Sequence, residues 1–163
     1  MAFDCYVKIA GIEGECTAAK HENWIQVLSY NHAITMPVSG VSDAGAPAAG
    51  RCEHTGFAIA KQLDKASPLL ALACSDGRHI DDVTVELCVA NKDKTPYMKY
   101  VMTDVIITGV GLAGSDGDKG RPEEDVTFCY GKIEWTYTIM DHKTFEPKGD
   151  VVNYYDVGRH EGG

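Results

Sequence analysis

The chain has 163 residues, 44% of them hydrophobic and 24% charged, which is the balance of one globular domain and excludes a disordered chain or a fibrous repeat. Lys and Arg number 15 and Asp and Glu 24, so the net charge is −9. This charge argues against binding to nucleic acid or to anionic lipid, because both reward a basic surface.

The start of the sequence lacks the features of a signal peptide. It has no basic segment followed by a long apolar stretch, and Asp4 and Lys8 interrupt its first apolar positions. No window of 18 apolar residues occurs, so we expect no membrane insertion. We expect synthesis in the cytoplasm without a signal peptide. The six cysteines show no Cys-x-x-Cys spacing, and we expect free, mostly buried thiols.

The first third of the chain is predicted to be mostly β-structure. Alternating apolar and polar residues predict a strand at 3–9. Residues 24–36 predict a longer strand with large apolar groups on both faces, one for the core and one for a partner. Residues 37–52 are rich in Gly, Ala and Pro and predict a long loop without a core element, a kind of segment that is often functional. Alternation resumes at 54–63.

One helix follows. Ser67 is the expected N-cap, Pro68 fits the first turn, and Gly77 supplies the stop. Apolar residues occupy much of the surface of this helix, so we expect it to be substantially buried.

Alternation returns in the second half of the chain. Three strands are predicted, at 83–89, 97–108 and 125–139, with an irregularity at Asp104 and with Trp135 and Tyr137 in the core. A turn at 91–96 and a polar loop at 114–124 separate the strands, and the tail from Asp141 is mostly polar. Seven or eight strands with one helix favour a closed or nearly closed antiparallel barrel, or a tight sandwich. A barrel of eight strands is filled by its own side chains.

Two sequence patterns suggest ligand sites and fail on their context. Residues 109–114 match Gly-x-Gly-x-x-Gly, but the polar residues that follow cannot form the helix that a dinucleotide site needs. Asp116 and Asp118 suggest a calcium loop, but Gly120 and Arg121 stand where an oxygen ligand and a glycine are required. We expect neither a bound nucleotide nor calcium.

A zinc site is the third candidate. Cys52 and His54 form a close pair, with His21 as a possible third ligand, but structural zinc sites normally show two such pairs. No other Cys/His or Ser/His pairing stands out. We expect no catalytic residues, no cofactor and no metal, and therefore no enzyme. The remaining signals, which are the two-faced strand, the Gly/Ala loop and the sheet edges, are typical of a protein that assembles.

Six segments together resemble the haemolysin-coregulated protein (Hcp) family, whose members are tube subunits of bacterial type VI secretion systems. The segments are 2–15, 21–30, 61–68, 73–80, 83–87 and 130–137. The resemblance implies a β-barrel of two antiparallel sheets with one flanking α-helix. It covers residues 1–139 of a single domain, 1–163, and is weaker over the tail, 140–163.

The resemblance also implies a structural role. Six copies of such a subunit form a ring, and rings stack into a tube that a contractile sheath expels with its spike. Small effectors ride in the lumen, and the tube protein is itself secreted. Two alternatives stay open: a tail-tube-like subunit of another contractile injection machine, and a free-standing small-ligand-binding barrel or enzyme.

Two sets of residues are candidates for contacts in such an assembly. The 37–52 loop is expected to reach a neighbouring subunit, through Pro37, Val38, Val41, Pro47 and Arg51. Ser29 and Asn31, small polar residues of the long strand, are expected to face the lumen. Val41→Asp should weaken rings without unfolding the subunit, because it places a charge in an apolar contact.

Overall fold

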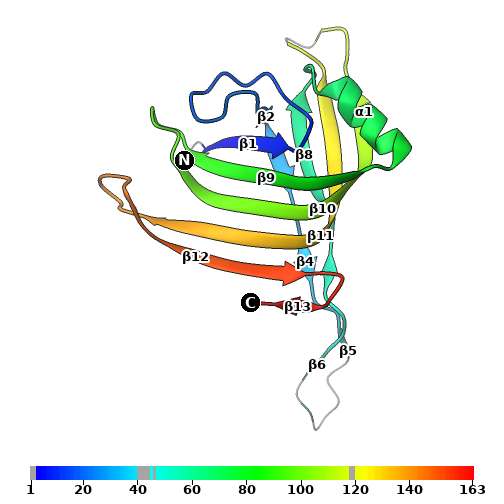
Figure 1. The fold of residues 1–163 in the computed structure, drawn as a ribbon, viewed down its shortest axis with the longest axis vertical. Helices are drawn as coiled ribbons and strands as arrows, with labels where there is room; N and C mark the ends of the chain where they lie inside the picture. Colours follow the sequence, from blue (N-terminus) through cyan, green and yellow to red (C-terminus); the bar gives the residue numbers. More distant parts are fainter. Residues whose placement is uncertain (1–2, 40–44, 46, 118–119) are drawn as a thin grey trace.

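The computed structural model describes residues 3–39, 45, 47–117 and 120–163 as one helix and thirteen strands (Figure 1). The strands before the helix are β1 (Phe3–Ile9), β2 (Ile25–Val27), β3 (Ser29–Asn31), β4 (Ile34–Thr35), β5 (Val38–Ser39), β6 (Ala48–Ala49), β7 (Glu53–His54) and β8 (Phe57–Gln62). The helix α1 (Ser67–Asp76) is followed by β9 (His79–Val89), β10 (Pro96–Ala113), β11 (Glu123–Met140), β12 (Pro147–Asp156) and β13 (Glu161–Gly162).

The main strands pair in a circuit that closes on itself. Antiparallel pairing runs from β2 through β1, β9, β10 and β11 to β8, and β8 pairs with β3. Only Leu28 separates β2 from β3, and its N–H donates to the carbonyl of Ala60 in β8. The segment 25–31 therefore joins β1 with its first half and β8 with its second. The predicted class, mainly β with antiparallel sheets and one flanking helix, is confirmed.

The long hairpin of β10 and β11 belongs to two sheets. Near its turn, β11 pairs with β8 through residues 123–128, and near its open end it pairs with β12 through residues 132–140. The change of direction coincides with a register shift between Ile107 and Gly109. The predicted irregularity at Asp104 is also present, as a left-handed residue with φ 55°. Such breaks bend a strand and let it continue into a second sheet.

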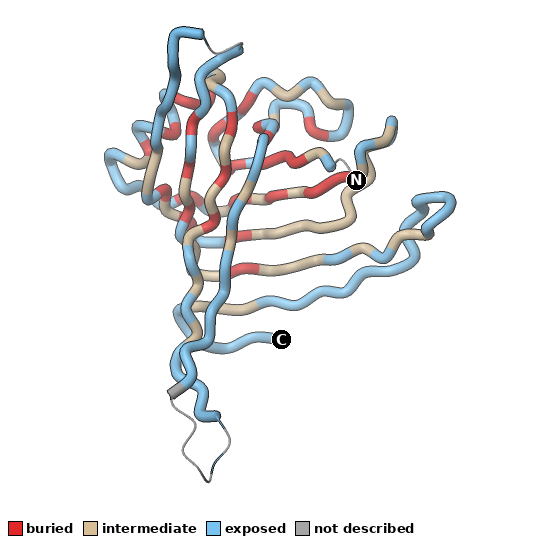
Figure 2. Tube along the Cα trace, turned by 180° about the vertical axis from the view of Figure 1, so that it is seen from behind, coloured by how far each residue is buried: buried red, intermediate tan, exposed pale blue. Residues whose placement is uncertain are grey.

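The core lies inside the circuit, and one part of the sheet extends beyond it. Figure 2 shows the buried residues gathered around β1, β8 and β9, while β12 is mostly exposed and the far end of β11 is mostly of intermediate burial. Phe57, Phe128 and Ile133 are completely buried in this core. We call residues 134–156, which include the second half of β11 and β12, the flange.

Two of the expected elements in the first third of the chain differ from the structure. The predicted strand at 24–36 is divided into β2, β3 and β4, because its residues change partner from β1 to β8 and then to β7. The predicted loop at 37–52 is in part a thin ribbon, in which β5 pairs with β6 and the Gly50 N–H donates to the Pro37 carbonyl at 2.8 Å. This ribbon projects away from the barrel (Figure 1), and none of its described residues belongs to the core.

The helix forms where predicted, but its start and its burial differ. Ala66 is the N-cap residue and Ser67 is the first helical residue, so the predicted cap is wrong. Gly77 ends the helix in the left-handed conformation, as predicted, with φ 62°. Only one stripe of α1 is buried, and Leu69 and Leu72 are 43% and 52% exposed, which contradicts the expected burial.

The C-terminal tail forms a strand that the sequence analysis did not predict. Residues 147–156 form β12, which pairs with β11 over nine positions from Lys132 to Met140. Most of β12 is exposed, so its residues lack the alternation that burial of one face imposes. The strands at 83–89, 97–108 and 125–139 lie within β9, β10 and β11, as expected.

Candidate functional site

The inner face of the flange carries several exposed apolar residues. One row of directly paired residues crosses β1, β9, β10, β11 and β12: Cys5, Leu87, Met98, Tyr137 and Val151. Cys5 and Leu87 are buried, whereas Tyr137 and Val151 are 49% and 53% exposed. The row thus begins with buried side chains in the core and ends with side chains that are about half exposed to solvent. The prediction that Tyr137 lies in the core is therefore wrong, while Trp135, two residues earlier, packs against the core.

A hollow of about 540 Å³ opens at this end of the sheet. Its apolar walls come from four elements or turns, through Val89, Tyr97, Ile139, Met140 and Phe145. Ile139 and Phe145 are 45% and 39% exposed. Single exposed apolar residues are ordinary, but a contiguous group around a hollow is typical of a contact site.

The opposite face of the flange is polar. A hollow of about 270 Å³ on that side is lined by Glu86, Lys99, Glu134 and Asp150 among other residues. Val152 is the apolar exception, at 50% exposed. Neighbouring residues of a strand point to opposite faces, so Val151 lies on the inner face of the flange and Val152 on the polar face. The exposed fractions of the two side chains are nearly equal, at 53% and 50%.

The predicted contact residues of the 37–52 segment lie on the projecting ribbon and its root. Pro37, Val38, Pro47 and Arg51 are exposed, with Val38 at 54%. Val41 lies outside the described residues. The predicted contact residues that the structure describes are therefore open to a second protein molecule.

Ser29 and Asn31 lie in two rows of small side chains on the outer surface of β3, β8, β11 and β10. The rows are Ser29, Ala60, Asp125 and Gly111, and Asn31, Ala58, Thr127 and Gly109. Ser29 and Asn31 are both exposed, and Tyr30 between them packs toward the core. Gly109 and Gly111 of the nucleotide-like pattern thus lie in strand β10 and Gly114 comes directly after it, and the described residues that follow form no helix.

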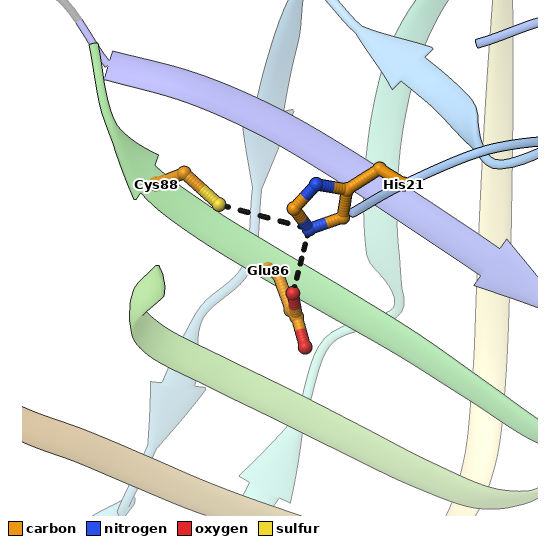
Figure 3. A group of neighbouring side chains, drawn as sticks. All are labelled: His21, Glu86 and Cys88. Atoms are coloured by element: carbon orange, nitrogen blue, oxygen red, sulfur yellow. Dashed lines mark hydrogen bonds and ion pairs between the residues drawn. The ribbon is translucent and has the colours of Figure 1, made fainter. Parts of the chain in front are cut away.

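A group of three side chains that the sequence did not predict comes together on β9, as Figure 3 shows, with His21 and Cys88 buried and Glu86 partly buried. Glu86 and Cys88 point from the outer face of β9, and His21 comes from the segment that crosses this face between β1 and β2. His21 Nε2 donates to Glu86 Oε2 at 2.7 Å and lies 3.8 Å from Cys88 Sγ. Burial, and then the charge of Glu86, raises the pKa of the Cys88 thiol to about 12.

His21 is therefore not close to Cys52 and His54, the partners proposed for it from the sequence. His54 Nδ1 instead contacts the hydroxyl of Tyr130 at 2.8 Å, and His32 Nε2 contacts the same hydroxyl at 2.6 Å. Burial lowers the pKa of both histidines, and His54 lowers that of His32 further. This cluster ties the root of the ribbon to β11.

The six cysteine thiols are free. Cys5 and Cys88 are fully buried, Cys129 is exposed, and the other three are intermediate, so the expectation that most are buried is wrong. Within the described residues, no helix is long and apolar enough to cross a bilayer.

Comparison with known proteins identifies the family. Residues 6–137 match the family described as "Type VI secretion system effector, Hcp". The chain is 32% identical to the "Major exported protein" of Pseudomonas aeruginosa over an alignment of 126 positions that covers 73% of this chain and 72% of that protein.

Two solved structures are similar over nearly the whole chain. One, of a type six secretion system protein, has a TM-score of 0.94 at 26% identity and covers 99% of this chain and 100% of its own. The other, Hcp1 from Salmonella typhimurium, has a TM-score of 0.82 at 27% identity and covers 99% of both chains. The family match over most of the sequence and the shared fold lead to one conclusion: the chain belongs to the Hcp family of type VI secretion proteins.

Proposed function

We propose that this protein is the tube subunit of a type VI secretion system. Six copies form a ring, rings stack into a tube, and the sheath of the machine expels the tube together with its spike and small effectors. The subunit is made in the cytoplasm, is secreted with the tube, and acts as a structural protein rather than an enzyme.

The observation that carries the proposal is the uncovered apolar face of the flange. A sheet that leaves Tyr137, Ile139 and Val151 half exposed beside a hollow needs a cover to be stable in water. A second copy supplies one of matching chemistry, because Leu69 and Leu72 of α1 and Val38 of the ribbon are exposed as well. A ring uses such complementary patches on every subunit and leaves none open.

The small-residue rows suit the wall of a lumen. Ser29, Asn31 and their paired neighbours on β8 and β10 project no long side chain, so they form a smooth surface against which cargo of varied shape can lie. We therefore propose that this surface faces the channel, and that Pro37, Val38, Pro47 and Arg51 contact the next subunit.

The two alternative functions, a subunit of another contractile machine and a ligand-binding barrel, have less support. The match to a type VI family favours that machine over another contractile injection machine, which the genes beside this one would identify. A ligand-binding barrel needs an open interior, whereas Phe57, Phe128 and Ile133 fill the interior here.

The test is the mass of the protein in solution, measured by light scattering on a gel-filtration peak, with negative-stain images of the same fraction. A ring of six 17.7 kDa subunits weighs about 106 kDa and appears as an annulus. Val151→Asp should shift the peak toward the monomer, because it buries a charge in the contact. Val152→Asp, on the polar face, is the matched control and should leave the ring intact.

Far-UV circular dichroism of both variants confirms that the fold survives. A wild-type monomer at high concentration would contradict the proposed ring. Equal loss of rings in the two variants would contradict the assignment of the contact to the inner face of the flange.

A further inference from the structure

We propose that His21, Glu86 and Cys88 form a binding site for a divalent transition-metal ion, with Zn²⁺ the best match to the ligand set. Imidazole nitrogen, thiolate sulfur and carboxylate oxygen are the three ligand types that zinc takes in proteins. The site lies within one subunit, so it does not depend on ring formation.

The three ligand atoms are close to the spacing that zinc requires. They lie within 4.8 Å of one another. Ligands at zinc distances of about 2.0–2.3 Å are about 3.3–3.8 Å apart when tetrahedral. The 3.8 Å between Cys88 Sγ and His21 Nε2 already fits. The Glu86 oxygen, at 2.7 Å from the same nitrogen, has to retreat by roughly half an ångström or slightly more to admit an ion.

The surrounding structure holds the imidazole in place before any ion binds. The His21 ring stacks on Tyr6, with centroids 4.2 Å apart and planes 13° apart, and it also makes an edge-to-face contact with Trp24, with centroids 4.8 Å apart. His21 is 1% exposed and Cys88 is fully buried. Because the rings leave the imidazole little freedom, binding an ion costs little further ordering of that ligand.

An ion can reach the site through Glu86. This carboxylate is 14% exposed and lines the polar hollow on the outer face of the sheet, together with Glu134 and Asp150. Three carboxylates around one hollow attract a cation, and Lys99, 3.9 Å from the far oxygen of Glu86, offsets only part of their charge.

Binding exchanges a proton for the ion. The Cys88 S–H bond breaks, its proton leaves to solvent, and the sulfur bonds the metal. The Nε2–H bond of His21 breaks and Nδ1 takes up a proton in its place, so that the freed Nε2 lone pair bonds the metal and one proton in all is released, that of Cys88. The two positive charges of the ion are then balanced by one thiolate and one carboxylate, and the fourth coordination position is left for water.

An unpartnered nitrogen of His21 weakens the site. Within the described part of the chain, His21 Nδ1 has no hydrogen-bond partner. A metal-bound histidine normally donates this N–H to an acceptor, and loss of that acceptor costs about 10–100-fold in affinity. We therefore expect reversible zinc binding, weaker than that of a structural zinc site.

The test uses the full-length protein, reduced and freed of metal with a chelator, and then titrated with Zn²⁺ or Co²⁺. One ion per chain should bind, and Co²⁺ should show a thiolate-to-metal charge-transfer band. Cys88→Ala should abolish the band and weaken Zn²⁺ binding at least tenfold. Cys129→Ser removes an exposed thiol elsewhere and is the matched control, which should bind like the wild type.

X-ray absorption at the zinc edge of the wild type gives a second readout that does not depend on the folding of a variant. One sulfur at about 2.3 Å with nitrogen and oxygen at about 2.0–2.2 Å supports the site. A shell without sulfur, or a charge-transfer band that persists in folded Cys88→Ala, would overturn it. Glu86→Gln, which keeps the shape of the side chain and removes its charge, should weaken binding severalfold.

Discussion

Lys61→Met should be among the most destabilising single substitutions in the barrel wall, because it leaves the carboxylates of Glu124 and Asp64 without their cation. Lys61 is fully buried on β8, directly opposite Glu124 of β11, whose side chain is 2% exposed. The ammonium Nζ lies 2.8 Å from Glu124 and 2.9 Å from Asp64, and it also donates to Ser67 Oγ and the Gln62 carbonyl. Among the described contacts of this cluster, the Lys61 ammonium is the only cation, and oxygen atoms surround it.

The size of the effect follows from what each substitution leaves behind. Removing Lys61 leaves the buried Glu124 carboxylate without a cation, and breaking a buried pair in this way costs about 3–5 kcal/mol. Glu124→Gln should cost less, about 1.5–3 kcal/mol, because Lys61 keeps Asp64 as a partner. For a chain of this size, the larger loss lowers Tm by about 6–20 °C.

Urea unfolding followed by circular dichroism, at one fixed protein concentration, measures these differences. The double variant Lys61→Met/Glu124→Met should be more stable than Lys61→Met alone, with a coupling energy of at least about 1 kcal/mol. A cost below about 1 kcal/mol for Lys61→Met, with an unchanged denaturant slope, would refute the reasoning, since it would mean that water reaches Glu124.

Two further predictions concern pH and backbone packing. Burial lowers the pKa of His32 and His54 below the ordinary value of 6.5, so the unfolded chain takes up these protons first, and stability should fall as pH drops below that value. Urea midpoints at pH 7.5 and 5.5 should show this, and His32→Gln should reduce the difference. Gly14→Ala places a Cβ 2.4 Å from the Trp24 carbonyl and should cost about 1–3 kcal/mol by thermal melting. Gly11→Ala, which has open space but φ 80°, should cost no more than about 1–2 kcal/mol, and a larger loss than for Gly14→Ala would contradict the steric argument.

The elements that the sequence predicted correctly are those with one buried face. β1, β9 and the buried halves of β10 and β11 alternate because the barrel wall separates core from solvent. In the isolated subunit both faces of β12 are exposed, so its sequence alternates only weakly between apolar and polar residues, and the sequence did not predict this strand. The same reason explains Tyr137, which was predicted to lie in the core and is 49% exposed.

The side-chain groups were less accessible to prediction. His21, Glu86 and Cys88 come together because the segment between β1 and β2 folds over β9, and 65 residues separate His21 from Glu86 in the chain. The only local signal was the pair of polar and thiol residues at alternate positions of β9. Spacing rules for zinc depend on ligands close in sequence, and they therefore pointed to Cys52 and His54 instead.

The shared hairpin of β10 and β11 has a mechanical consequence. The strands that close the barrel are the same strands that extend into the flange, without a hinge residue between them except the bend near Asp104 and Gly109. A pull on the flange is therefore borne by many backbone hydrogen bonds in parallel, along continuous strands. We expect a subunit built in this way to transmit a push from one end of the molecule to the other as a stiff body. Deforming it requires many of the hydrogen bonds between β10 and β11 to break together.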